Sequence, residues 1–358
     1  MLLYITRKNS PSIGGMQRFN QKLIAHLAAK EDFRLISWGR SQLFMPAFLL
    51  FAFGKALLLG LMGKIDRIYL SDGLMSPLGL LLKKILNVPV AVNIHGRDIA
   101  FNFPGYLTVV PAALRRLDRV ICVSGDLKKI CRGYGVPENI LRVVPNGVDI
   151  EDFTVTDKTT PPRSLGIDGE GRVILITVGR LVPKKGVDRF IADILPELVE
   201  RDPRLLYLVV GDGPLREKIE GIIAEKGLEK HVRMMGNVGM DDGSLTALYG
   251  AADIFVMPNA LVEGDIEGFG IVAIEGGAAG LPVVAARLQG IKEAIADGQN
   301  GILLEWNDRR AFIDTIADLA ADPEKRKKLG ARAREYVKKH YSWETIADRY
   351  REIFSRLK

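Results

Sequence analysis

The chain has 358 residues, of which 47% are hydrophobic and 26% charged, and its formal net charge is +7. This length predicts two domains with separate cores, and the composition excludes a disordered or fibrous protein. Residues 1–160 hold 21 Lys and Arg against 12 Asp and Glu, whereas the remaining residues hold 29 against 31. The basic first half indicates either ordinary solvated helices or an anionic partner, such as a phosphorylated sugar or a lipid headgroup; no nucleic-acid-binding motif accompanies it.

Two cysteines, Cys122 and Cys131, are present. They do not form a CxxC pair and lie near no pair of histidines, so the pattern supports neither a disulfide framework nor a zinc site. The opening run MLLYITRKNS is too short for the apolar core of a signal peptide and is typical of a first strand. We therefore expect a cytoplasmic protein in a reducing compartment.

The first half alternates short β-branched runs with amphipathic segments. Between residues 16 and 30, Met16, Phe19, Leu23 and Leu27 recur at helical spacing. Such an alternation predicts parallel strands linked by helices. The predicted strands lie at 2–6, 66–71, 88–96, 118–125 and 141–147, and the predicted helices at 16–30, 77–86 and 124–135.

An apolar stretch, Leu43–Met62, holds twenty residues with a single charge, Lys55. Its length would span a bilayer. However, Pro46 and two glycines interrupt it, and Lys55 at mid-depth would cost about 2.5–3.5 kcal/mol. Three interpretations are open: buried helices in a layer that flanks the sheet, which we favour; a helix lying on the membrane surface; and a transmembrane span.

A polar segment, Asp149–Gly171, contains Pro161 and Pro162 and predicts a linker. After it the alternation restarts. The further predicted strands lie at 172–180, 204–213, 232–237, 252–259, 281–286 and 301–305. We therefore expect an α/β protein with two Rossmann-like, doubly wound parallel-sheet domains, 1–163 and 164–341, that face each other across a cleft.

Seven motifs occur in a fixed order along the chain: SIGGMQRF, HGRD, VPNGVD, VGRLVPKKGVD, VVGDGPLREKIE, LYGAADIFVMPN and EGFGIVAIEGGAAGLPVVA. The ordered set resembles the retaining glycosyltransferases of family 4, whose fold is GT-B. The likeness covers residues 2–355 and includes the segment YSWETIADRYREIF near the C-terminus. It implies that a helix at 342–358 packs back onto the first domain.

The resemblance implies a retaining hexosyltransferase that moves a hexose from a UDP- or GDP-linked sugar to a hydroxyl of a glycan or lipid-linked glycan. The first domain would bind the acceptor and the second the nucleotide sugar. The segment GDIEGFGIVAIE is most similar to versions in mannosyl- and related transferases with lipid or polysaccharide acceptors, as in cell-envelope polysaccharide synthesis. With the basic first half, this implies a peripheral contact with the anionic inner face of a membrane.

The stretch EGFGIVAIE places Glu267 eight residues before Glu275. Eight helical residues span roughly 12 Å, so the two acids serve different parts of a long ligand. We expect Glu275 to accept hydrogen bonds from the ribose hydroxyls and Glu267 to face the hexose. Unpaired amides at the start of a helix between them are expected to point at the diphosphate. These amides belong to Gly268, Phe269, Gly270 and Ile271.

Cleavage of the glycosidic bond leaves negative charge on the diphosphate, so positive side chains at that position should have the largest effect on the rate. Arg180 and Lys185 are expected to bind the leaving group, and Lys184 is the alternative to Lys185. In the first domain, Gly14 and Gly15 at the start of a helix are expected to offer amides to the same diphosphate when the cleft closes.

His95 follows a predicted strand of the first domain, and the resemblance implies that it contacts the donor hexose. Retention in this family is usually ascribed to same-face attack, so His95 is expected to position and polarise and is not required as a base. Arg97 and Asp98 are expected to face the acceptor. The residues expected around the nucleotide base are Gly236, Asn237 and Val238.

The segment Asp265-Ile266-Glu267 looks like a DxD metal clamp, but positive side chains and amides already supply an anion site, so we expect no obligatory metal. Three other functions remain open. A nicotinamide-dependent oxidoreductase would need GxGxxG after the first strand, which is missing. A GT-B phosphorylase or epimerase would share the fold. The complete set of charged site residues argues against a catalytically silent sugar-nucleotide-binding protein.

Overall fold

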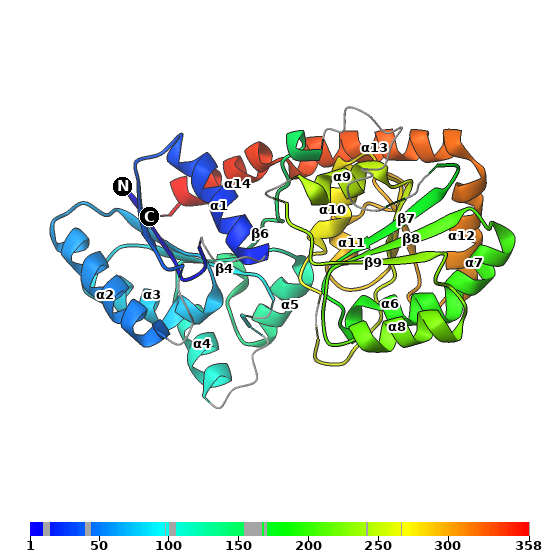
Figure 1. The fold of residues 1–358 in the computed structure, drawn as a ribbon. Coiled ribbons are helices and arrows are strands. Elements are labelled where there is room, and N and C mark those ends of the chain that lie inside the picture. The colour runs from blue at the N-terminus through cyan, green and yellow to red at the C-terminus, as the bar shows by residue number, and fades with distance from the viewer. Residues whose placement is uncertain are drawn as a thin grey trace. The chain divides into compact units, whose positions relative to one another are not determined.

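The computed structural model describes residues 1–9, 15–39, 44–96, 98–99, 105–153, 167, 170–240, 243–265 and 267–357. The chain divides into two units (Figure 1). Unit 1 comprises Met1–Gly147 and Trp343–Lys358, and unit 2 comprises Val148–Ser342. The sequence boundary at residue 163 lies outside the described residues, and each unit is described by itself.

A six-stranded parallel sheet forms the centre of unit 1, with its strands in the order β2-β1-β3-β4-β5-β6. Strands β1 and β4 are wholly buried and mostly apolar, as parallel strands covered on both faces should be. The sequence pattern does not predict the edge strand β2, because only Ile36 of its five residues is buried. The strands are β1 (Leu2–Thr6), β2 (Phe33–Ser37), β3 (Arg67–Leu70), β4 (Val90–Ile94), β5 (Arg119–Cys122) and β6 (Leu141–Val143).

Helices pack on both faces of this sheet. On one face, Tyr4 shares a core with Phe19 of α1 and Tyr350 of α14, and Figure 1 shows the red helix α14 beside the blue helix α1. On the other face, α3 approaches β3 so closely that a Cβ on Gly79 would lie 2.4 Å from the Leu70 side chain. The helices are α1 (Gly15–Ala28), α2 (Met45–Leu61), α3 (Ser76–Leu86), α4 (Tyr106–Leu114), α5 (Gly125–Gly133) and α14 (Trp343–Ser355).

A second six-stranded parallel sheet forms unit 2, in the order β12-β11-β10-β7-β8-β9. The predicted fold class of two Rossmann-like parallel sheets is therefore confirmed. Across the sheet, the buried Thr177 donates to the Val256 carbonyl and accepts from the Tyr207 hydroxyl. The strands are β7 (Val173–Val178), β8 (Leu205–Val210), β9 (Val232–Gly236), β10 (Ile254–Met257), β11 (Val283–Ala286) and β12 (Ile302–Leu304).

The helices of unit 2 follow these strands in turn. After β7, a π-helical turn at Phe190–Ile194 joins α6 to α7, and such turns are frequent near functional sites. The helices are α6 (Val187–Arg189), α7 (Leu195–Arg201), α8 (Arg216–Glu225), α9 (Ser244–Ala251), α10 (Ile271–Ala278), α11 (Ile291–Ala294), α12 (Arg309–Ala321) and α13 (Pro323–Tyr341).

Helix α2 corrects our favoured interpretation of the apolar stretch. The stretch does form a helix, but Phe48, Ala52 and Ala56 are the only buried residues of that helix. Leu50 and Leu61 are 74% and 73% exposed. The stretch is therefore a surface helix with one buried stripe and not a fully buried layer. Across the part of the chain that the structure describes, no helix is both long and apolar enough to cross a membrane.

Candidate functional site

The carboxyl ends of the unit 2 strands carry most of the predicted site residues. In a parallel sheet all strands end at one edge, so the loops that follow them meet there. Hydrogen bonds join these loops to one another. The Gly179 amide donates to Val210 O at 2.9 Å, the Gly211 amide to Gly236 O at 2.7 Å, and the Ala260 amide to Lys184 O at 3.0 Å.

Gly211 lets two of these loops approach closely. Its φ is +131°, and a Cβ there would lie 2.0 Å from Gly179 O. No other residue fits such a conformation and contact without displacement of the backbone. The glycine in the VVGDG motif is therefore required by the packing of β8 against the loop that carries Arg180.

Gly211→Ala is expected to lower the free energy of unfolding by about 2–4 kcal/mol, because it adds a clash with backbone to an unfavourable φ. The matched control is Gly221→Ala in α8, where the added Cβ meets no described atom within 4 Å. That control should gain up to about 1 kcal/mol from helix propensity. Urea unfolding compares the two variants; equal stabilities would contradict the close approach.

Three cations lie in the loop after β7. Arg180 is exposed, and no described residue forms an ion pair or hydrogen bond with its side chain. Leu181 beside it is 1% exposed and anchors the loop. Lys184 and Lys185 follow in a short 3-10 turn, with side chains 15% and 14% exposed. The loop therefore holds one open guanidinium and two largely covered ammonium groups.

Each lysine pairs with a carboxylate of the loop after β10. Lys185 Nζ lies 2.8 Å from Glu267 Oε2, and Lys184 Nζ lies 2.7 Å from Asp265 Oδ1. Asn259 Nδ2 also donates to Glu267 Oε2 at 3.2 Å. The structure thus brings the predicted Lys185 and Glu267 together and neutralises both acids of the DxD-like segment, whose middle residue Ile266 lies outside the described residues.

The environment of Glu267 keeps its carboxyl ionised. Burial alone would raise the pKa of Glu267, but the charge and hydrogen bond of Lys185, with smaller effects of Lys184 and Asn259, hold that pKa below its ordinary value. The Gln289 side chain fixes the same residue by accepting from the Glu267 amide at 2.6 Å. A charged, positioned carboxylate can accept hydrogen bonds from sugar hydroxyls.

The start of α10 offers unpaired amides. Gly270 precedes the helix with φ +81° and a left-handed conformation that suits glycine. No described group accepts a hydrogen bond from the amides of residues 268–271. The Phe269 ring is buried against Tyr341, with centroids 5.8 Å apart, so only its backbone is available. These four amides form a candidate anion site.

Glu275 lies further along α10 and is 4% exposed. Its Oε2 accepts from the Tyr249 hydroxyl at 2.8 Å. A carboxylate can accept more than one hydrogen bond, so Tyr249 and a ligand hydroxyl could share it. The predicted ribose contact therefore stays a prediction, with Tyr249 as the side chain that fixes the carboxylate.

The three residues predicted near the base lie at the carboxyl end of β9, at the same edge of the sheet. Gly236 ends β9 and accepts from the Gly211 amide. Asn237 is exposed and Val238 half-buried. Arg216 lies beside them, with a guanidinium nitrogen 3.7 Å from the position of a Cβ on Gly236. A base at this point remains a prediction.

Unit 1 contains a second cluster, which includes His95 and Asp98. The Asp98 carboxylate is buried and accepts from the amides of His95 at 2.9 Å, Gly96 at 2.7 Å and Gly73 at 3.0 Å. This geometry indicates that Asp98 holds the loop that carries His95. The contact of Asp98 with an acceptor stays a prediction. The predicted Arg97 and Gly14 lie outside the described residues, while Gly15 is exposed at the start of α1.

The His95 ring is held in one orientation. Its Nε2 lies 3.0 Å from Ser71 O and 2.9 Å from the Asn93 side-chain amide. The Ser71 carbonyl would accept from a protonated Nε2, whereas Asn93 Nδ2 would donate to an unprotonated one, so the two contacts orient the ring without selecting a tautomer. Burial lowers the pKa of His95 by more than Asp98 and Asp72 raise it, so the ring is neutral at pH 7.

The sequence motifs did not mark four residues of these clusters as site residues. Asn259 and Gln289 both contact Glu267 in unit 2. In unit 1, Arg7 pairs with the wholly buried Asp72 at 3.0 Å. All four follow the ends of strands, so the rule that polar residues at strand ends form the site would have selected them.

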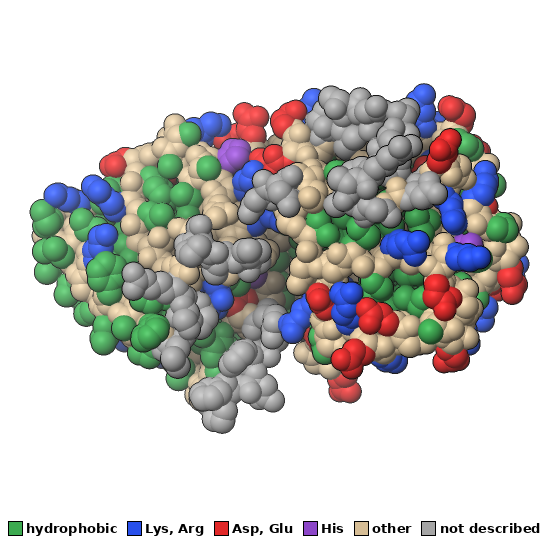
Figure 2. Space-filling model, viewed as in Figure 1, with side chains coloured by type: hydrophobic (Ala, Val, Ile, Leu, Met, Phe, Trp, Pro, Cys, Tyr) green, Lys and Arg blue, Asp and Glu red, His purple; other side chains and the backbone are tan. Residues whose placement is uncertain are grey.

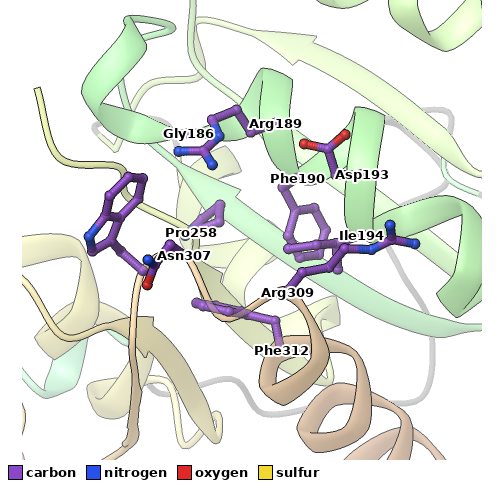
Figure 3. Close-up of a pocket in the computed structure, with 10 residues that line it drawn as sticks. Gly186, Arg189, Phe190, Asp193, Ile194, Pro258, Asn307, Arg309 and Phe312 are labelled. Atoms are coloured by element: carbon purple, nitrogen blue, oxygen red, sulfur yellow. The ribbon is translucent and has the colours of Figure 1, made fainter.

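A cavity of about 130 Å³ lies on unit 2 between the loop at Gly186 and helix α12 (Figure 3). Phe190 lines its interior, and Arg189 stacks over the Trp306 ring at 4.9 Å. None of the predicted site residues lines this cavity. It is therefore a feature separate from the cluster around Lys185.

Comparison with known proteins identifies two family matches. Residues 157–336 match the family described as Glycosyl transferases group 1. Residues 13–152 match Glycosyltransferase Family 4. Together the two matches cover both units, and the first includes every predicted site residue of unit 2.

The similar relatives include mannosyltransferases. A GDP-mannose-dependent alpha-(1-6)-phosphatidylinositol monomannoside mannosyltransferase from Mycolicibacterium smegmatis is 32% identical over 275 residues, which is 74% of this chain and 70% of the relative. The GDP-mannose-dependent monoacylated alpha-(1-6)-phosphatidylinositol monomannoside mannosyltransferase of Corynebacterium glutamicum is 26% identical over 381 residues. The match covers 98% of this chain and 97% of the relative.

Among solved structures, Anabaena Alr3699/HepE in complex with UDP superposes with a TM-score of 0.81. The match covers 99% of this chain and 100% of that one at 20% identity. At this identity the likeness shows the shared GT-B fold.

Proposed function

The chain belongs to the family 4 glycosyltransferases, and from that premise we propose that it is a retaining hexosyltransferase with a nucleotide-sugar donor. The reaction would break the bond between the anomeric carbon and the diphosphate and form a bond from the same carbon to an acceptor hydroxyl. The acceptor proton would leave with the diphosphate. No metal is required in this proposal, because cations and amides stabilise the leaving group.

One observation carries the proposal: the carboxyl edge of the unit 2 sheet combines an open Arg180, the Lys185–Glu267 ion pair at 2.8 Å and the unpaired amides at the start of α10. Positive charge that is already in place at the leaving group stabilises the transition state without reorganisation. In this site a diphosphate would compete with Glu267 for Lys185. The released carboxylate could then accept from the hexose hydroxyls.

The proposed roles of the other site residues follow from their positions at the ends of the strands. Glu275 would accept from the ribose, and Gly236, Asn237 and Val238 would surround the base. In unit 1, the neutral ring of His95 would contact the hexose. Unit 2 would thus be the donor domain and unit 1 the acceptor domain.

Two sources suggest the donor, and they differ. The named relatives use GDP-mannose, whereas the similar solved structure holds UDP. The relatives act on phosphatidylinositol mannosides, which supports a lipid-linked glycan as the acceptor class. We place the enzyme in the cytoplasm, in contact with the inner face of the membrane and in cell-envelope glycan synthesis.

A thermal-shift panel of UDP- and GDP-linked hexoses tests the donor. One nucleotide sugar at about 100 times its Kd should stabilise the chain by about 2.7 kcal/mol, which is a rise of several degrees in Tm. A panel in which no nucleotide sugar raises Tm would contradict the proposal. The anomeric proton coupling of the product, measured by NMR, tests retention: an inverted anomer would exclude it.

A further inference from the structure

The large exposed apolar side chains of the protein are concentrated on one part of unit 1. Of eleven such side chains among the described residues, nine lie on or directly beside helices α2, α3 and α4. We call these nine the apolar face. They are Phe44, Leu50, Phe51, Leu58, Leu61, Met62, Leu81, Ile85 and Val109.

Helix α2 turns most of its large apolar residues outward, and its buried side holds mainly small ones. Besides Phe48, it buries two alanines, Ala52 and Ala56, against the unit and exposes leucines such as Leu58 and Leu61, which are 60% and 73% exposed. A surface helix that faces only water places its large apolar residues inward. The outward leucines recur at helical spacing, so they form one stripe and not scattered exceptions.

The three helices adjoin, so their exposed side chains form one surface. Helix α3 contacts both α2 and α4. At the α2–α3 contact, a Cβ on Gly60 would lie 2.5 Å from the Leu86 side chain, so the two helices are in close contact. Figure 2 shows hydrophobic side chains gathered over the end of unit 1 where Figure 1 labels α2 and α3.

The three segments that carry the apolar face hold cations and no acidic residue, and two acids just outside them, Asp66 and Asp118, pair with the Met1 amine and with Lys83. Segments 44–65, 73–88 and 105–117 contain no Asp or Glu. Lys55, in the middle of the exposed stripe, lies with its Nζ 5.7 Å from the Phe51 ring centroid. Further exposed cations in these segments are Lys64, Lys84, Arg115 and Arg116. Lysines on an apolar surface can extend their charged ends into a lipid headgroup layer.

We propose that the apolar face docks the protein on an anionic lipid bilayer, with the leucines and phenylalanines among the acyl chains and the lysines at the headgroup phosphates. A surface that combines large exposed apolar residues with several exposed cations fits an anionic membrane. This docking proposal takes one element from the proposed function, the lipid-linked acceptor. It assigns unit 1 the side that meets the membrane.

Vesicle flotation of the full chain tests this docking. The protein is mixed with vesicles of phosphatidylcholine alone or with equal parts of phosphatidylglycerol, and the wild type should float with the anionic vesicles and much less with the neutral ones. Leu58→Asp/Leu61→Asp should lower the partition coefficient by about tenfold or more. Lys55→Gln/Lys84→Gln should lower it by about tenfold or more on anionic vesicles alone.

The matched control is Leu261→Asp, because Leu261 is a comparably exposed leucine, at 54%, in unit 2. It should float like the wild type. Equal flotation of wild type and the Leu58/Leu61 variant, or no flotation of either, would overturn the proposal. So would sedimentation data in which the wild type is a dimer and that variant a monomer, since a second copy would then cover the face. Thermal shifts with nucleotide sugars on the same samples report donor binding independently, so the two proposals can fail separately.

Discussion

Arg180→Ala is expected to lower kcat by about 10²–10³, the effect of removing one donor that stabilises transition-state charge. Arg180 is exposed at the carboxyl edge of the unit 2 sheet, with no described residue bound to its guanidinium. Its loss therefore removes no contact within the protein, and stability should stay within about 0.5 kcal/mol of the wild type. Steady-state kinetics with the donor found in the thermal-shift panel measure the effect.

The matched control for this variant is Arg204→Ala. Arg204 precedes β8 at the opposite edge of the same sheet and pairs with Asp202 at 2.8 Å. Its removal should leave kcat unchanged. An Arg180→Ala enzyme with the same kcat as the wild type would show that the guanidinium does not stabilise the leaving group.

Lys185→Met is expected to lower kcat by about 10² and to destabilise the protein by about 2–3 kcal/mol. The two effects have different origins. The rate falls because a cation at the leaving group is lost. The stability falls because Glu267, 16% exposed, keeps its charge while Asn259 is the remaining hydrogen-bond partner of its carboxylate among the described residues. Urea unfolding and steady-state kinetics on the same variant separate them.

The double variant Lys185→Met/Glu267→Gln distinguishes catalysis from folding. With both charges removed, stability should return to within about 1 kcal/mol of the wild type, because an ion pair replaced as a whole costs little. Turnover should remain low. Recovery of turnover together with stability would mean that the pair only holds the two loops together.

Lys184 provides the internal comparison. It pairs with Asp265, which is 45% exposed, so breaking this pair should cost no more than about 1 kcal/mol. We expect Lys184→Met to retain most of the wild-type kcat. If Lys184→Met were the inactive variant and Lys185→Met active, the diphosphate contact would belong to Lys184.

The parallel sheets could be predicted because buried strands leave a strong signal. The β7 and β8 runs are continuous apolar segments bounded by glycine, and periodicity identifies them directly. The edge strand β2 gives no such signal, since four of its five residues are not buried. Helix α2 shows a different reason for failure. Its apolar composition predicts a buried helix, but whether a helix is buried depends on the elements that cover it. The local sequence does not specify those elements.

The residues of the candidate site can be chosen from the sequence, and their roles stay predictions, but their pairings cannot be read from the sequence. Arg180, Lys185 and Glu267 follow from the chemistry of a leaving diphosphate and from their positions after strands. That Lys185 and Glu267 pair directly depends on the loops after β7 and β10 lying side by side, which the strand order determines. Asp98 illustrates the same point, because three backbone amides from two loops surround its carboxylate.

A crystal structure of the chain with its nucleotide-sugar donor tests the central claim most directly. We predict that the diphosphate lies within about 3 Å of the Arg180 guanidinium, the Lys185 ammonium and the amides at the start of α10, with the ribose on the Glu275 side and the hexose toward Glu267. A donor bound elsewhere, or bound here with its diphosphate touching neither cation, would contradict the proposed mechanism.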